Sequence, residues 1–413
     1  MSAFALLVHE ARAELRAGLR SGIVGLVFLG LAGYLLMSLT NADYVQKMGA
    51  ADIPRNAPSL VYLMSTGCMF FLFFAWAWVF AQPLLRDRQV SLHEIVLSMP
   101  NSLQALLWGR FIGASLVGAL LAGALIAGFI ATPVLAWMGM VPAGSITAPP
   151  WRALMFAWVW LLIPAGTGIG ALYYLATLRT RSVAGAFGLS ALLMLLWMFA
   201  VVVLKGGHIN PILAAALDPS LFTYAQTQIE TWTPLQKTSS LLPLTPEFLL
   251  NRALWGGVPL LLLYWVLRGI QRESLVLERP TRSRSGKSVK AAARDVPRLA
   301  HPLTAIETPR WWSALRLETL WQCRQIVRGR GWWIGVAVLL AMGVLSAFVH
   351  GVWHAEGPMV PRPDMLLPLL KSAVFLVIAF IVAAMVGLIS RRDQVEGFDG
   401  MFDATPAPAW LRP

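Results

Sequence analysis

Long apolar runs alternate with short charged segments along all 413 residues of the chain. A helix needs roughly 20 mostly apolar residues to cross a bilayer, and eight runs approach or exceed that length. These runs predict an all-α polytopic membrane protein with about eight transmembrane helices. They cover residues 23–40, 60–81, 111–137, 154–175, 183–204, 253–267, 332–350 and 369–389.

The composition supports membrane insertion and argues against a nucleic-acid partner. Hydrophobic residues make up 57% of the chain and charged residues only 13%, whereas soluble domains carry about 25% charged residues. The net charge of +13 is concentrated, because residues 268–330 hold 14 Lys and Arg against 5 Asp and Glu. A basic loop between spans is typical of the cytoplasmic side of a membrane protein. The charge therefore indicates topology rather than binding to DNA or RNA.

The basic residues also set the predicted orientation and the domain boundaries. Arg and Lys lie in the loops after spans two, four and six and after span eight, while the alternate loops are nearly neutral. The positive-inside rule then places the N-terminus in the cytoplasm. We expect a cytoplasmic interfacial helix at 1–20, a six-span unit at 21–270, a basic flexible linker at 271–312 and the start of a second unit at 313–413.

The chain contains an internal duplication. Residues 86–100 and 392–406 align without a gap at an offset of 306, with the same Arg-Asp start and the same Pro at the end. Residues 9–20 and 317–328 align at an offset of 308 and share one Glu and two Arg. Each copy reads as an amphipathic helix, a span, an outer loop, a span and a charged cytoplasmic helix. We therefore expect a six-span repeat followed by two spans of a second, truncated repeat.

The charged segment after the second span contains a short amphipathic helix. Leu92, Ile95, Val96 and Met99 follow helical spacing on one face, and Pro100 ends the pattern. Such a helix can dock on a partner and pass force to the spans, or it can be a solvated connector at the membrane interface. Periodicity alone favours the connector, and the repetition of the segment makes the two interpretations equally supported.

No pattern in the chain predicts catalysis, a cofactor or a metal site. Two His-Glu pairs begin like the zinc-peptidase motif, but Ala13 and Leu97 stand where the second histidine ligand belongs. The Gly-Lys-Ser at 286–288 lacks the upstream glycine of a phosphate-binding loop, because Thr281 occupies that position. Ion-coupled carriers need ionisable residues inside the spans, and the predicted spans contain almost none. We expect neither an enzyme nor an ion-coupled carrier.

Small residues recur inside the third and fourth spans. In lipid, helices associate where small side chains let backbones approach closely, so we interpret these positions as helix-packing sites. A moving interface in a transport cycle is the alternative. The packing candidates are Gly118, Gly123, Gly128, Gly166 and Gly170.

The helix after the second span resembles a known motif. In the permease subunits of type-2 ABC exporters, a Glu followed by Leu-Ser-x-Pro lies in the region that contacts the ATPase, and residues 94–100 are similar to it. The resemblance implies a separate ABC-type ATPase as partner. The second copy departs from the motif at Gly400 and Ala404. The implied coupling residues are Arg86, Asp87, Arg88, Glu94, Ser98 and Pro100 in the first copy and Arg392, Asp393, Glu396 and Pro406 in the second.

The outer loop resembles a subgroup of that family in which two permease halves are fused. Some members of the subgroup continue into a zinc aminopeptidase-like domain. The resemblance implies a permease of the bacterial inner membrane that moves an unidentified substrate with ATP hydrolysed by its partner. It would work as a dimer or by pairing two halves within one chain. The alternative is a membrane anchor for a C-terminal peptidase-like domain outside this chain. The similarity is carried by residues 218–219, 224, 232–233, 242–244 and 251–255.

Overall fold

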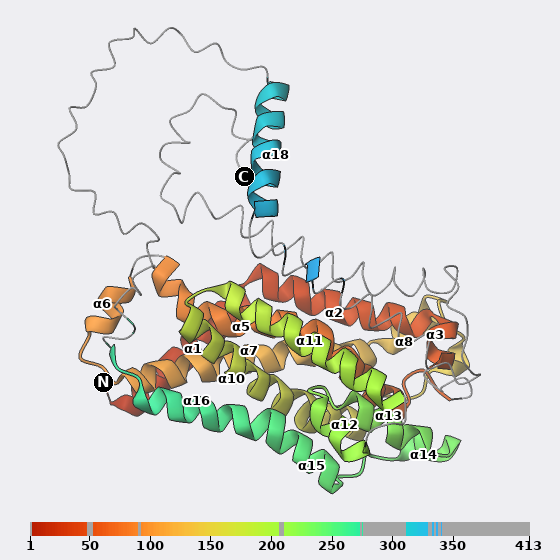
Figure 1. Cartoon of the computed structure of the whole chain (residues 1–413). Helices are drawn as coiled ribbons and strands as arrows, with labels where there is room; N and C mark the ends of the chain where they lie inside the picture. The colour runs from red at the N-terminus through yellow and green to blue at the C-terminus, as the bar shows by residue number, and fades with distance from the viewer. Residues whose placement is uncertain are drawn as a thin grey trace, which may run out of the picture. The chain divides into compact units, whose positions relative to one another are not determined.

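The computed structural model describes residues 2–47, 53–89, 92–205, 210–272, 275, 311–328, 333, 336–337 and 340. Every regular element within these ranges is helical (Figure 1). The chain divides into two units, Met1–Arg279 and Pro280–Pro413. In the second unit the structure describes helix α18 (Trp311–Arg328). Apart from residues 333, 336–337 and 340, the predicted spans at 332–350 and 369–389 lie outside the described residues, as does most of the predicted linker.

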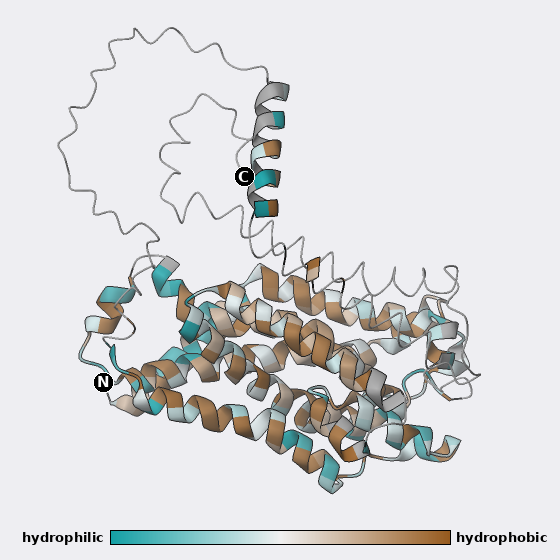
Figure 2. Cartoon of the chain, in the orientation of Figure 1, coloured by the Kyte–Doolittle hydropathy of each residue, from teal (hydrophilic) through white to brown (hydrophobic). Residues whose placement is uncertain are grey.

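Six helical segments of the first unit are long and apolar enough to cross a membrane, and they correspond to the first six predicted spans. Figure 2 shows apolar residues along these helices and hydrophilic residues gathered toward the two ends of the bundle. Two of the segments contain a π-helical turn, η2 or η3. The segments are α2 (Gly22–Thr40), α5 (Met69–Gln89), α7 (Leu103–Ile130) with α8 (Thr132–Trp137), α9 (Trp151–Phe156) with η2 (Ala157–Leu162) and α10 (Ile163–Thr180), α11 (Val183–Lys205), and α15 (Pro246–Arg252) with η3 (Ala253–Gly257) and α16 (Val258–Gly269).

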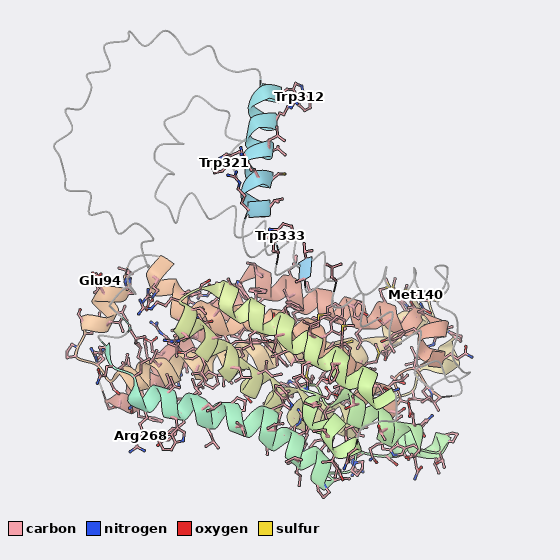
Figure 3. The ribbon with its side chains drawn as sticks, in the orientation of Figure 1. Glu94, Met140, Arg268, Trp312, Trp321 and Trp333 are labelled. Carbon is pink, nitrogen blue, oxygen red and sulfur yellow. The ribbon has the colours of Figure 1, made fainter. Side chains whose placement is uncertain are left out.

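Short helices mark the two ends of this bundle, which we call the α6 end and the α13 end. Helices α1 (Ala3–Arg20) and α6 (His93–Ser98) lie at the first, where Figure 3 also places Glu94 and Arg268. Met140 lies at the other end. The short elements of the α13 end are α3 (Ala42–Lys47), α4 (Pro58–Gly67), η1 (Ala143–Ser145), α12 (Pro211–Leu217), α13 (Phe222–Glu230) and α14 (Pro234–Ser239).

The predicted second span, residues 60–81, is divided between two helices. Helix α4 ends at Gly67, and α5 begins at Met69 and continues past Pro83 to Gln89. Every residue from Pro58 to Thr66 is buried, because α4 packs against α13, α14 and η2. Helix α4 is buried by the protein at the α13 end. Its apolar composition therefore led to the prediction of one continuous span where the structure has two helices.

Helix α1 packs directly on α7. A Cβ atom added at Gly109 would meet the Leu7 carbonyl oxygen at 2.6 Å, and one added at Gly113 would meet the Ala11 carbonyl oxygen at 2.8 Å. Only a residue without a side chain permits so close an approach of two backbones. The predicted interfacial helix at 1–20 is therefore present as α1, and one of its faces belongs to the bundle.

Gly113→Ala should destabilise the protein by about 1–3 kcal/mol, because the added methyl group meets backbone atoms of α1 that cannot rotate away. The thermal midpoint of the purified protein in detergent measures this loss. Gly30→Ala in α2 is the matched control, since no neighbouring atom of the described residues lies within 4 Å of its added carbon and alanine favours a helix. Equal midpoints for the two variants would contradict the close packing of α1 on α7.

Three of the five predicted packing glycines lie against aromatic rings. Gly118 of α7 and Gly166 and Gly170 of α10 face the side chains of Trp76 and Phe80 on α5. Both rings are fully buried, and the Trp76 indole N–H donates to the Gly118 carbonyl at 3.1 Å. At these positions the missing side chain makes room for a ring between two helices, so α5, α7 and α10 form the aromatic centre of the bundle.

The other two predicted glycines have different surroundings. Gly128 lies against the backbone and a leucine of α2, and Gly123 makes only an ordinary contact with Trp158. The tightest backbone approach of α10 is instead at Gly168, which lies on the Trp255 carbonyl of η3. The small-residue pattern identified α7 and α10 as closely packed helices. Which of their glycines contacts a neighbouring backbone depends on how each pair of helices crosses.

Asp218 organises the α13 end. Its carboxylate accepts hydrogen bonds from the Thr223 N–H at 2.7 Å and from the Ser220 N–H and hydroxyl, each at 2.8 Å. The Asn251 amide donates to the Asp218 carbonyl at 2.7 Å. Burial raises the pKa of the Asp218 carboxyl above its ordinary value, and these hydrogen bonds oppose the rise. The described part of the predicted outer loop is thus an ordered set of short helices.

Candidate functional site

The predicted coupling residues of the first copy divide between two elements. Residues 86–88 belong to the last turn of α5, whereas Glu94 and Ser98 lie in α6 and Pro100 follows it. The last three residues are exposed. The Leu92 N–H donates to the Asp87 carbonyl at 2.8 Å and joins the two elements. The structure therefore separates an inward group on α5 from an outward group on α6.

One exposed side of α6 is apolar, beside the exposed polar residues Glu94 and Ser98. Leu92, Ile95 and Met99 are 47%, 56% and 44% exposed, and their spacing places them along one side of the helix. Val96, the fourth member of the predicted apolar face, packs against the small buried cluster that contains Leu6 and Leu106. The predicted face therefore splits into one contact with α1 and α7 and three side chains that point away from the described bundle.

An ionic network joins α5 to α1 and α7 beneath this surface. Arg86 binds both carboxylate oxygens of Glu14, with Nη1–Oε1 at 3.1 Å and Nη2–Oε2 at 2.9 Å. Arg110 of α7 binds Glu10 through Nε at 3.1 Å and Asp87 through Nη2 at 2.6 Å. The network holds two acids of α1, two residues of the predicted coupling segment and one arginine of a span.

Burial governs the electrostatics of this network. The Glu14 side chain is only 8% exposed, and burial raises the pKa of its carboxyl, while the charges of Arg86 and Arg110 oppose the rise. A bidentate guanidinium–carboxylate pair has fixed geometry as well as strong hydrogen bonds. Because each buried charge has a partner of opposite sign, α1 and the end of α5 are held as one unit.

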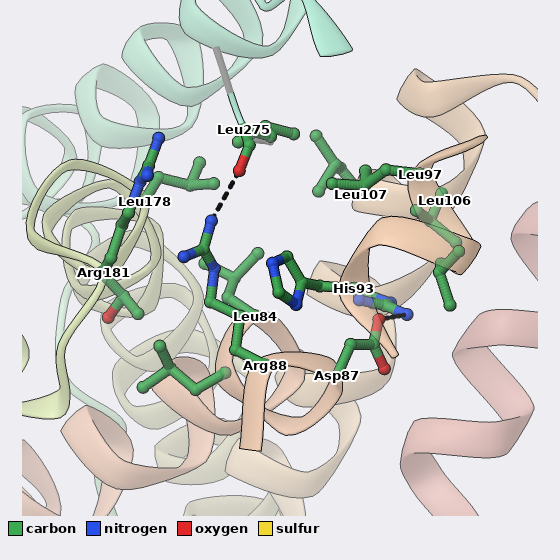
Figure 4. A pocket seen from close by; sticks show the side chains of 14 residues that line it. Leu84, Asp87, Arg88, His93, Leu97, Leu106, Leu107, Leu178, Arg181 and Leu275 are labelled. Carbon is green, nitrogen blue, oxygen red and sulfur yellow. Dashed lines mark hydrogen bonds and ion pairs between the residues drawn. The ribbon is translucent and has the colours of Figure 1, made fainter. Parts of the chain in front are cut away.

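The segment after the sixth span reaches back to α6. Arg272 donates hydrogen bonds to the carbonyls of Leu97 at 2.7 Å, Met99 and Asn101. Arg88 of α5 donates to the Leu275 carbonyl at 2.6 Å, the contact drawn in Figure 4. Arg272 thus holds the end of α6, and Arg88 holds the segment that contains Arg272.

Two cavities separate α6 from the spans. One of about 50 Å³ lies between α5, α6, α7 and α10 (Figure 4), and the His93 imidazole lines it. The His93 Nδ1 atom is buried and has no hydrogen-bond partner among the described residues. The second, of about 200 Å³, lies between α1, α7 and Arg272. Helix α6 therefore rests on a few polar contacts more than on close packing, and such elements move more readily than a packed core.

Arg272→Ala should release the end of α6. Hydrogen bonds from a charged donor contribute about 1.5–3 kcal/mol, so we expect amide hydrogen exchange in residues 93–101 to accelerate by about 10- to 100-fold. Hydrogen–deuterium exchange with mass spectrometry measures this change. Arg268→Ala removes an exposed arginine from the same end and serves as the control. Unchanged exchange in residues 93–101 of the Arg272 variant would show that Arg272 does not hold α6.

Sequence reasoning missed four residues of this site: Glu10, Glu14, Arg110 and Arg272. The apolar pattern predicts a third span that begins at residue 111, which places Arg110 in the loop before it. Ser102 instead caps a helix that starts at Leu103, so Arg110 lies inside α7 with its side chain buried. Glu10 and Glu14 lie four residues apart and so share one face of a basic amphipathic helix. This pattern could have predicted that they pair with basic residues of another helix.

The remaining predicted residues and the comparisons add no further partner. Arg392, Asp393, Glu396 and Pro406 lie outside the described residues. Within the described ranges, no group of three or more His, Cys, Asp or Glu residues can hold a metal ion. No protein-family model matches the chain, and no curated protein matches its sequence.

Proposed function

We propose that this chain is the permease component of an ABC-type transporter and that a separate ATPase binds at α6. One observation carries the proposal: a short helix turns an apolar surface outward, while hydrogen bonds tie it to α5 and to the segment after α16 and Val96 packs on α1 and α7. The resemblance of residues 94–100 to the ATPase-contacting region of type-2 ABC exporter permeases supports the same role. The chain itself then performs no catalysis, and the ATPase supplies the energy.

The contacts beneath α6 suggest how a partner would act on the spans. A push on α6 reaches α16 through Arg272 and reaches α5 through the Leu92–Asp87 hydrogen bond. From Asp87 the displacement passes through Arg110 to α7 and to Glu10 on α1. Helices α5, α7 and α10 share the aromatic centre of the bundle, so a shift of α5 repacks that centre. The transported substrate is unidentified.

The distribution of arginines supports an orientation with the α6 end in the cytoplasm of a bacterial cell and the spans in its inner membrane. Cytoplasmic loops carry an excess of Lys and Arg. Described arginines of the α6 end lie on five helices and in the segments that follow α10 and α16. They are Arg12, Arg16, Arg20, Arg86, Arg88, Arg110, Arg179, Arg181, Arg268 and Arg272.

Co-purification with the ATPase encoded nearest to this chain tests the proposal. We expect the tagged wild-type chain to retain the ATPase and both Glu94→Arg and deletion of residues 91–100 to lose it. Glu230→Arg, an exposed charge reversal on α13, should retain it. Retention of the ATPase by both α6 variants would overturn the docking role.

A further inference from the structure

The charges of α1 are sorted between its two faces. Both of its acids, Glu10 and Glu14, point into the bundle and pair with arginines of α7 and α5. All three of its arginines, Arg12, Arg16 and Arg20, are exposed and form no ion pair among the described residues. Their spacing of four residues places them along one side of the helix. The outer side of α1 therefore carries three positive charges that no acid of the helix balances.

A cavity of about 410 Å³ opens where α1 turns into α2. Its walls are apolar or small, and its polar lining comes from the Glu14–Arg86 pair, Gln82 and Ser21. The Ser21 hydroxyl makes no capping hydrogen bond to α2. The Arg86 side chain remains 42% exposed although it binds Glu14, and a guanidinium has five N–H donors, of which this pair uses two. Val24, Trp78 and Val79 form an apolar part of the wall, and Ala17 of α1 also lines the cavity.

The position of the cavity indicates which class of ligand it would bind. Helix α2 crosses the membrane from Gly22, and its first turns expose Ile23, Leu26 and Leu29. The turn before Gly22 therefore lies at the depth of the lipid headgroups. There an occupant meets an apolar wall together with the half-exposed guanidinium of Arg86, the two environments that a phospholipid requires.

We propose that the turn between α1 and α2 binds an anionic phospholipid from the leaflet at the α6 end. An acyl chain would lie on Val24, Trp78 and Val79, and the phosphate would accept hydrogen bonds from Arg86 and Ser21. The Glu14–Arg86 pair is neutral as a whole, and Arg12, Arg16 and Arg20 do not line the cavity. These three arginines therefore act on the headgroup through their positive field at the membrane surface and not through direct contact. They favour a negatively charged headgroup over a zwitterionic one.

Native mass spectrometry of the full chain in detergent tests this proposal with dioleoyl phosphatidylglycerol and dioleoyl phosphatidylcholine at equal concentrations. We expect the wild-type chain to retain the anionic lipid at least about fivefold more than the zwitterionic one, and Arg12→Gln/Arg16→Gln/Arg20→Gln to remove that preference. Substituting the same three arginines with lysine should preserve it. Ala17→Phe, which fills the cavity, should reduce retention of both lipids.

A charge-matched control separates a site from general attraction. Arg152→Gln/Arg179→Gln/Arg268→Gln removes three exposed arginines elsewhere and should leave the lipid preference intact. The thermal midpoint checks that each variant is folded, and in the wild type the anionic lipid should raise it more than the zwitterionic lipid does. Equal retention of the two lipids by the wild-type chain, or equal loss of preference in both triple variants, would overturn the proposal.

Discussion

Arg110→Ala should be among the most destabilising single substitutions in the described part of the chain. The Arg110 guanidinium binds Asp87, Glu10 and the Pro83 carbonyl from inside α7. Its removal leaves two partly buried carboxylates without their counter-charge, and breaking a buried ion pair by removing one partner costs about 3–5 kcal/mol. We expect the thermal midpoint in detergent to fall by roughly 10 °C.

Two comparisons identify the cause of that loss. Arg179→Ala removes an exposed arginine from the same end of the bundle, and its midpoint should stay within about 1–2 °C of the wild type, because exposed charges contribute little. Adding Glu10→Gln and Asp87→Asn to Arg110→Ala should recover part of the lost midpoint, since the uncompensated charges are then gone. A midpoint for Arg110→Ala equal to that of the Arg179 variant would contradict the stabilising role of the network.

The helices that could be predicted are those whose signal is local. Apolar runs located six membrane-crossing segments, and the amphipathic pattern of residues 1–20 located α1. The division at Cys68 could not be predicted, because residues 60–64 are apolar for a different reason: they are buried against α13, α14 and η2. The hydropathy of a residue indicates that its side chain is removed from water, but it does not indicate whether lipid or protein surrounds that side chain.

The candidate site was predicted in part for the same reason. Residues 86–100 could be singled out because they are charged, end at a proline and resemble a second segment of the chain. Which of them face a partner depends on three other elements. Asp87 points inward because Arg110 lies on α7, and Leu97 is held because Arg272 follows α16. These contacts join residues 23 and 175 positions apart, and no local pattern encodes them.

Ile95→Asp should weaken the complex between this chain and the ATPase proposed as its partner by at least about 30-fold. Ile95 is the most exposed of the three apolar side chains on α6, and it lies between Leu92 and Met99. Central apolar side chains of an interface commonly contribute about 2 kcal/mol or more to binding, which corresponds to that change in Kd. The substitution places a charge in the centre of the proposed contact without touching the network beneath it.

The Kd of the purified complex, measured in detergent by surface plasmon resonance, checks this expectation. Leu235→Asp is the matched control, because Leu235 is 75% exposed on α14 at the opposite end of the bundle, and it should bind the ATPase as the wild type does. The two thermal midpoints should agree, since both side chains are exposed. If Ile95→Asp binds with the wild-type Kd, the apolar surface of α6 is not the contact, and α6 is a connector at the membrane interface.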